Sequence, residues 1–229
     1  MSPRSNKPSV SLYYKKEIVD SFVADPHAPF LVSFPRTGSH WLRMVMELYF
    51  ERPLLTRIFF FHDKRHFLAL HTHDLELDIQ RRNVLYLYRN PVDTIFSYLR
   101  YYKEDSTDFG VIEERAAFYG RHLNKWLLDE DFTKKKTILC FDRLRKNPET
   151  EFPKICDHFD RPFDAIRLER CIAQVSKDHV RTKVPDDPRV IDPARDYDRR
   201  REAFRSRYGE YVRSIVFKRP ELRASFKHH

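Results

Sequence analysis

Residues 34–41 have the residue types of a loop that binds an anion. An apolar run precedes them and a segment with helical spacing of apolar residues follows them, so we expect a strand, a tight turn and the start of a helix. That geometry directs several backbone N–H groups and the positive end of a helix dipole at one negative charge. Arg36 adds a fixed charge, and Gly38 lets the backbone turn without a Cβ in the way. The alternative is an ordinary strand-to-helix turn capped by a hydroxyl.

A second run, residues 83–88, also has the composition of a strand and ends at an arginine. Asn90 suits a helix cap and Pro91 suits the first helical position, so a helix is expected through residues 92–100. Arg89 would then lie at the mouth of a second strand–helix junction, with Ser97 on the helix. The alternative is an arginine that pairs with a carboxylate and a serine that points at water.

The glycine content separates the possible phosphate-binding loops. The chain contains four glycines, Gly38, Gly110, Gly120 and Gly209. Neither the G-x-G-x-x-G fingerprint of dinucleotide-binding proteins nor the G-x-x-x-x-G-K-[ST] loop of Walker NTPases can be written with them. A conventional Rossmann dehydrogenase and a conventional Walker NTPase are both disfavoured.

Together, these two segments resemble the motifs of the sulfotransferase family that uses 3′-phosphoadenosine 5′-phosphosulfate (PAPS). The first family motif reads Y-P-K-[ST]-G-[ST]-[ST]-W, and residues 34–41 match it with Arg36 in place of lysine and His40 in place of Ser or Thr. The resemblance implies that this loop grips the 5′-phosphosulfate. The residues it assigns there are Arg36, Thr37, Gly38, Ser39, His40 and Trp41.

The second family motif reads R-[ND]-P-x-D-x-x-x-S-[YF], and residues 89–98 fit it without a gap. The resemblance implies that Arg89 and Ser97 hold the 3′-phosphate. Residues 137–144 are similar to a family strand that ends Y-E-D-L and precedes a charged helix, with Phe141 at the aromatic position beside the adenine. The similarity runs over residues 29–160 in the family's order and spacing.

Two family motifs are missing. The C-terminal R-K-G-x-x-G-D-W loop, which closes over the 3′-phosphate in the cytosolic enzymes, has no counterpart; Arg181 and Lys183 could supply the same charge. The K-x-x-x-T-V-x-x-x-E dimer motif is also absent, which leaves the oligomeric state open.

The candidate general base lies in the sequence His-Thr-His-Asp of residues 71–74, which resembles the family's K-T-H. This alignment places His73 at the base and His71 where lysine usually stands. An imidazole can accept a hydroxyl proton near neutral pH. The alternative is a buried core histidine. With Arg36 stabilising charge, the resemblance implies in-line sulfuryl transfer to a hydroxyl or amine, release of adenosine 3′,5′-bisphosphate, and no metal.

The order of the predicted elements indicates one α/β domain. The 229 residues have room for one sizeable core. We expect residues 1–9 to form a disordered tail and residues 10–229 to form the domain. Alternating strands and helices indicate a parallel sheet with helices on both faces, and the resemblance implies the P-loop-like sulfotransferase fold. A short strand is predicted at 67–73, and helices near 111–129, 148–159, 164–175 and 196–216.

Composition limits the partners. A net charge of +9 suits a polyanionic donor, and no nucleic-acid-binding motif is visible. No stretch approaches the roughly 20 apolar residues of a membrane span, no secretory leader is visible, and three dispersed cysteines suit a reducing compartment, so a cytoplasmic protein is expected. The acceptor stays open between a small molecule, a lipid and a glycan. Aromatic side chains (residues 59–61, 101 and 102) favour a phenol or lipid, and basic ones (residues 64, 65, 81 and 82) an acidic glycan.

Two other functions fit parts of the pattern. A nucleotide-dependent phosphotransferase uses a similar loop but ordinarily needs Mg²⁺ and a Walker lysine. A non-catalytic basic nucleotide-binding protein would retain the fold without turnover, although a retained His73 disfavours it.

Overall fold

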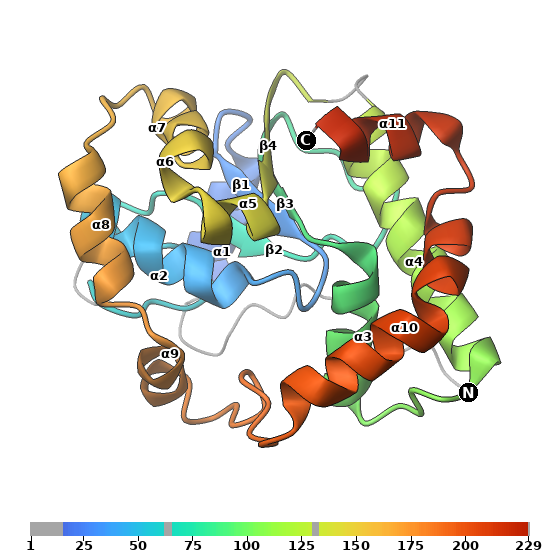
Figure 1. The fold of residues 1–229 in the computed structure, drawn as a ribbon. Coiled ribbons are helices and arrows are strands. Elements are labelled where there is room, and N and C mark those ends of the chain that lie inside the picture. The colour runs from blue at the N-terminus through green and yellow to red at the C-terminus, as the bar shows by residue number, and fades with distance from the viewer. Residues whose placement is uncertain (1–15, 62–65, 130–132, 229) are drawn as a thin grey trace.

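The computed structural model describes residues 16–61, 66–129 and 133–228, and it shows a parallel sheet between two layers of helices (Figure 1). The described strands follow the order β2-β1-β3-β4, and every neighbouring pair is parallel. They are β1 (Phe30–Ser33), β2 (Leu70–Thr72), β3 (Asn83–Tyr88) and β4 (Lys135–Cys140). The predicted α/β class, with a parallel sheet flanked on both faces, is confirmed.

Helices make up most of the remaining chain. Four of them join the sheet strands: α2 (Ser39–Phe50), α3 (Pro91–Tyr102), α4 (Phe109–Leu123) and the π-helical turn η1 (Asn124–Leu128). The others are α1 (Lys16–Ala24), α5 (Phe141–Lys146), α6 (Pro148–Glu151), α7 (Pro153–His158), α8 (Ala165–Ala173), α9 (Lys177–Lys183), α10 (Tyr197–Val216) and α11 (Pro220–His228).

Alternation along the strands builds two cores, because successive side chains of a strand point to opposite faces. Phe30 and Val32 of β1 pack in one core with α3, α4, α10 and α11. Leu31 packs in the other, with α2, α5, α7 and α8. Both faces are therefore covered, and β1 and β3 consist almost wholly of buried residues, as expected for a parallel sheet.

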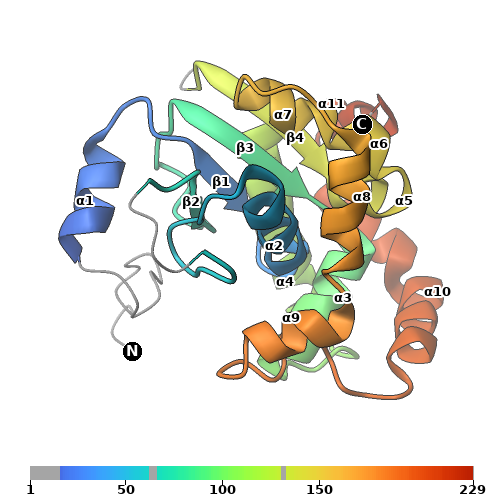
Figure 2. The same cartoon turned by 90° about the vertical axis from the view of Figure 1, so that its left-hand side faces the viewer.

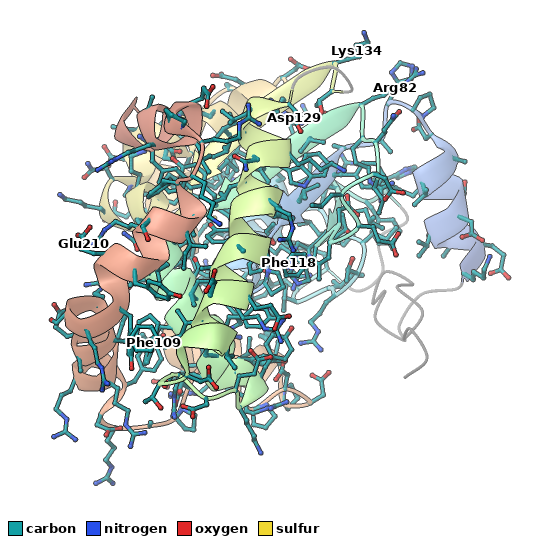
Figure 3. All side chains as sticks on the ribbon, turned by 90° about the vertical axis from the view of Figure 1, so that its right-hand side faces the viewer. Arg82, Phe109, Phe118, Asp129, Lys134 and Glu210 are labelled. Atoms are coloured by element: carbon teal, nitrogen blue, oxygen red, sulfur yellow. The ribbon has the colours of Figure 1, made fainter. Side chains whose placement is uncertain are left out.

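The functional edge of the sheet is the one at the carboxyl ends of the strands. Arg82 and Lys134 mark the opposite edge, where β3 and β4 begin, and the Lys134 N–H donates to the Arg82 carbonyl at 2.8 Å (Figure 3). Helix α1 lies beside the β2 edge of the sheet, away from β4 (Figure 2). The loops after β1, β2, β3 and β4 leave the sheet on the side where ligands of α/β proteins bind.

Two predicted strands are longer than the observed ones. The strand expected at 67–73 is only three residues long, because Thr72 and Asp74 turn the chain. The Thr72 hydroxyl donates to the Asp74 carboxylate at 2.8 Å, and Asp74 has a left-handed φ of 38°. The strand expected at 137–144 ends at Cys140, where the Glu151 carboxylate accepts the Cys140 N–H at 2.8 Å, and helix α5 starts at Phe141.

Each predicted helical segment is helical in the structure, but the ends and divisions of the helices differ from the prediction. Helix α10 matches the prediction within one residue, and Asn90 caps α3 by accepting the N–H groups of Val92 and Asp93 at 3.0 and 3.4 Å, with Pro91 at the first position. The segment 111–129 divides into α4 and η1, and the segment 148–159 into α6 and α7. Helices α1, α9 and α11 were not predicted. The tail expected at residues 1–9 lies outside the described residues.

Candidate active site

The loop between β1 and α2 presents an uncapped helix end. Gly38 caps α2 with a left-handed φ of 93° and has no side chain to accept the first N–H groups of the helix. The first helical bond runs from the Leu42 N–H to the Gly38 carbonyl at 3.2 Å, so the N–H groups of Ser39, His40 and Trp41 precede it. Such N–H groups, with the helix dipole behind them, attract an anion. This confirms the predicted strand, turn and helix.

Phe141 covers this loop from the end of β4. A Cβ at Gly38 would lie only 2.2 Å from the Phe141 ring, so the ring packs directly on the glycine backbone. The Trp41 ring meets Phe141 edge-on, with 6.0 Å between the ring centroids. The structure therefore brings together the two aromatic residues that the sequence places beside the donor.

Arg36 points from the loop toward α3 and a C-terminal segment. Its Nε donates to Ser97 Oγ at 3.2 Å, its Nη2 donates to the Val190 carbonyl at 2.8 Å, and its guanidinium lies 4.5 Å from the centroid of the Tyr101 ring. Burial is the main cause that lowers the pKa of Arg36, and the charge of Arg89 lowers it further. Among the residues that the structure describes, Arg36 has no ion pair with a carboxylate, so its charge is open to a ligand.

Arg89 adds a second cation at the same junction. Its Nη1 donates to the Arg36 carbonyl at 3.3 Å, and its guanidinium lies 5.3 Å from the Phe141 ring centroid. Carboxylate oxygens of Asp93 and Asp142 lie 3.9 Å from Arg89 nitrogens, beyond hydrogen-bonding distance. Within the described chain, Arg89 Nε is buried and has no hydrogen-bond partner. A buried guanidinium nitrogen without an acceptor is satisfied if an anion binds.

Asp93 is instead held by α10. Arg205 donates to its two carboxylate oxygens at 2.7 and 2.6 Å, a bidentate pair. This pairing fixes the first turn of α3. Because both Asp93 oxygens accept hydrogen bonds from Arg205, Asp93 balances the charge of Arg89 only in part.

His73 lies one residue beyond β2. Its Nδ1 donates to the Ser33 carbonyl at 2.6 Å, which leaves the lone pair on Nε2. Burial, the largest effect, lowers the pKa of His73 to about 4, so the imidazole is neutral at pH 7. A neutral imidazole with a free Nε2 can accept a proton.

His71 contacts the side chain of the same serine, Ser33. Its Nε2 lies 3.0 Å from Ser33 Oγ, and the His71 and His73 rings contact each other edge-on with centroids 4.9 Å apart. His71 is buried within β2, whereas His73 lies past the strand's carboxyl end.

A buried pair behind His73 was missed by sequence reasoning. His122 Nε2 donates to the His73 carbonyl at 2.8 Å, and the Tyr86 hydroxyl donates to His122 Nδ1 at 2.9 Å. Both side chains are fully buried. Helical spacing could place His122 in the core, but no sequence signal connects it with a residue 49 positions earlier.

The side chains of Thr37 and His40, also in this loop region, contact other parts of the protein. The Thr37 hydroxyl donates to the Phe34 carbonyl at 2.8 Å, which fixes the turn. The His40 ring packs edge-on against Phe59, and burial lowers its pKa well below the ordinary value.

The structure does not bring Arg181 and Lys183 to this cluster. Arg181 is exposed and pairs with Asp178 at 2.8 Å, and Lys183 lies over the Phe60 ring at 4.7 Å. The C-terminal segment that reaches the loop is the next one, through the Val190 carbonyl.

A cavity of about 570 Å³ adjoins Arg36. Its lining residues are Arg36, Ser97, Leu99, Arg100, Tyr101, Lys103, Glu104, Ser106, Arg189, Asp192, Pro193, Ala194 and Tyr197. Tyr101 is therefore the one member of the predicted aromatic set that lines this cavity. Phe59 is buried in the core, and Arg81 makes a two-bond ion pair with Asp74 at 3.0 Å. Residues 64 and 65 of the predicted basic set lie outside the described chain.

In residues 16–61, 66–129 and 133–228, no group of three or more His, Cys, Asp or Glu side chains is arranged to hold a metal. No helix in the same ranges is long and apolar enough to cross a bilayer.

Comparisons with known proteins agree with this geometry. The sequence model of the sulfotransferase domain matches residues 65–186, and no curated protein matches the chain. The fold is similar to mouse sulfotransferase SULT7A1 complexed with PAP, with a TM-score of 0.59 at 16% identity over 93% of this chain and 94% of that one. It is also similar to retinol dehydratase in complex with androsterone and PAP, with a TM-score of 0.54 at 12% identity over 84% and 81%.

Proposed function

Because this chain belongs to the sulfotransferase domain family, we propose that it moves a sulfuryl group from PAPS to an acceptor hydroxyl or amine and releases adenosine 3′,5′-bisphosphate. One observation carries the proposal. Arg36, Arg89 and Phe141, from three separate strand ends, meet at the uncapped start of α2. The two similar structures named above were determined with PAP, the adenosine bisphosphate product, which supports this choice of donor.

The residues at this junction fit a donor with two anionic ends. Arg36 and the N–H groups at the start of α2 would hold the 5′-phosphosulfate. Arg89, whose Nε has no acceptor in the described chain, and Ser97 would hold the 3′-phosphate. Phe141 and Trp41 would flank the adenine. Charge-assisted hydrogen bonds of this kind are about twice as strong as neutral ones.

The chain's own groups can support an in-line transfer. As the acceptor oxygen bonds to sulfur and the bond from sulfur to the bridging oxygen breaks, His73 Nε2 takes the acceptor's proton. Arg36 and the α2 N–H groups stabilise the negative charge that develops on the phosphate of the leaving group. The guanidinium of Arg36 keeps its proton, so its contribution is electrostatic.

The alternatives have weaker support. A phosphotransferase of the Walker type needs a lysine directly after the loop glycine, and Ser39 follows Gly38 in this chain. A non-catalytic nucleotide-binding protein has no use for a neutral histidine with a free Nε2 at the strand end.

The proposal extends to the acceptor and to the cellular compartment. The retinol dehydratase structure contains androsterone, and we propose a small-molecule, lipid or glycan acceptor here. Cys140, Cys156 and Cys171 are free and buried, which suits the reducing cytoplasm.

Thermal shift with nucleotides tests the donor assignment. Adenosine 3′,5′-bisphosphate should raise the Tm more than ADP or AMP does, because only the bisphosphate engages Arg89. Arg89→Ala should remove most of this preference, a loss of about 1.5–3 kcal/mol for a charged hydrogen bond. Arg207→Ala, which removes an exposed arginine stacked on Tyr208, serves as the control and should keep it. Equal shifts with ADP and the bisphosphate in the unmutated protein would contradict the assignment.

A further inference from the structure

The cavity beside Arg36 joins the donor loop to a separate set of side chains. Helix α3 provides one wall through Tyr101, and the segment before α10 provides another through Arg189 and Tyr197. Because Arg36 and Ser97 also line it, the cavity is continuous with the proposed donor site. Its volume of about 570 Å³ suits one small molecule or a sugar unit of a larger one.

The charges in this cavity are not balanced. Arg100 pairs with Asp192 at 3.1 Å, and Glu104 binds Arg115 through two bonds of 2.8 and 3.0 Å, so both carboxylates of the lining are neutralised. The remaining cations are Arg36, Lys103 and Arg189, and the described residues give none of them an ion pair. The nearby Asp187 carboxylate accepts the Tyr101 hydroxyl at 2.7 Å.

Arg189 is held in place without being neutralised. Its Nη1 donates to the Tyr101 carbonyl at 2.9 Å, and its guanidinium lies 4.9 Å from the centroid of the Tyr101 ring. Arg36 lies 4.5 Å from the centroid of the same ring. Two cations thus share one aromatic ring, an arrangement that an anion between or beside them would stabilise.

We propose that this cavity is the acceptor site and that it selects an acceptor bearing an anionic group near its hydroxyl. This inference rests on the proposed sulfuryl transfer. The hydroxyl would lie at the Arg36 end, the acceptor's ring against Tyr101 and Tyr197, and the anionic group at Arg189 and Lys103. Arg189 lies beyond residues 65–186, which match the family model.

Two matched acceptor pairs test the proposal, because both phenols and sugars can carry a carboxylate. The first pair is 4-hydroxyphenylacetate and its methyl ester; the second is methyl glucuronide and methyl glucoside. We expect kcat/KM for transfer from labelled PAPS to favour the anionic member of at least one pair by roughly 10- to 100-fold, the value of a charged hydrogen bond. Arg189→Gln should reduce that ratio to near one. Arg207→Gln, which removes a similarly stacked arginine outside the cavity, should leave it unchanged.

Several results would overturn the proposal. The first is a neutral acceptor used as well as its anionic partner in both pairs, and the second is an anionic preference that persists in Arg189→Gln. The third is that no member of either pair is turned over or shifts the Tm of the bisphosphate-loaded protein. A fourth is an Arg189→Gln variant that loses the Tm shift with adenosine 3′,5′-bisphosphate, since the cavity would then belong to the donor. The unmutated protein's preference for the bisphosphate over ADP tests the donor assignment separately.

Discussion

Replacing Gly38 by alanine should damage both the fold and the donor site. The backbone at Gly38 has a φ of 93°, a left-handed conformation that costs a residue with a Cβ about 1–2 kcal/mol. The new Cβ would also lie 2.2, 2.4 and 2.6 Å from three carbon atoms of the Phe141 ring, where no real Cβ contact is found. Overpacking of this kind costs about 1–3 kcal/mol, so the expected loss is roughly 2–5 kcal/mol in total.

Urea denaturation of the purified protein measures this loss as a lower midpoint at unchanged slope. Gly209→Ala is the matched control. Gly209 lies in the middle of α10, where an added Cβ meets only the flexible end of Arg213, at 3.2 Å. Alanine is favoured over glycine inside a helix by about 0.5–1 kcal/mol, so this variant should be as stable as the unmutated protein or slightly more stable.

A second substitution separates the two causes. Phe141→Leu shortens the ring that the new Cβ would strike, so the double variant Gly38→Ala/Phe141→Leu should recover the steric part of the loss but keep the part due to φ. The coupling energy should be about 1–3 kcal/mol. If Gly38→Ala unfolds at the same urea concentration as the unmutated protein and binds adenosine 3′,5′-bisphosphate equally well, the contact between loop and ring is not the one described here.

Three further predictions concern catalysis and pH. His73→Ala should lower kcat by ~10²–10⁴ with normal binding of adenosine 3′,5′-bisphosphate, whereas His71→Ala should mainly affect stability or donor affinity; the opposite pattern would move the base by two residues. Arg36→Ala should lower kcat by ~10²–10³ and Arg36→Lys should keep substantial activity, so an Arg36→Ala enzyme as fast as the unmutated one would refute the loop assignment. The pKa is lowered to about 4 for His73, about 3 for His122 and about 4 for His158. As the pH falls, the unfolded chain therefore takes up protons before the folded one does. The contribution of these buried histidines to the free energy of unfolding is fully present above about pH 6.5 and should fall as the pH drops toward 4, by at most ~1.4 kcal/mol per histidine and pH unit. A flat pH–stability curve over this range would contradict the burial of these histidines.

The strand–helix junctions could be predicted from sequence because their signals are local. An apolar run, a glycine or proline at the turn, and a cap such as Asn90 act within a few residues, and the structure confirms both junctions. Helix α9 lacked such a signal, since it buries only Val180 and therefore has no apolar stripe. It is capped by Ser176, which accepts the His179 N–H at 3.1 Å, but serine caps of this kind are common in loops.

Some contacts between distant segments could not be predicted. The position of the missing family loop, together with charge, suggested Arg181 and Lys183 as the basic residues near the donor. The chain turns after α9, however, and brings Val190 to Arg36 and Arg189 to Tyr101. Nor does any residue spacing reveal that His122 donates a hydrogen bond to the His73 carbonyl. Which of several similar residues reaches a site depends on the path of the chain, and that path is set by packing in the two cores.

The hydrogen bond from Arg36 to the Val190 carbonyl also has a consequence for the order in which the protein assembles. Its two residues are 154 positions apart, so the contact closes a very long loop of chain. During synthesis, β1 and β3 can pair and α2 can pack against them while Arg36 still lacks this partner. Contacts of such separation form late, because the entropy of closing the loop opposes them until the intervening elements have packed. The arginine of the anion-binding loop is therefore positioned only after most of the chain has been made.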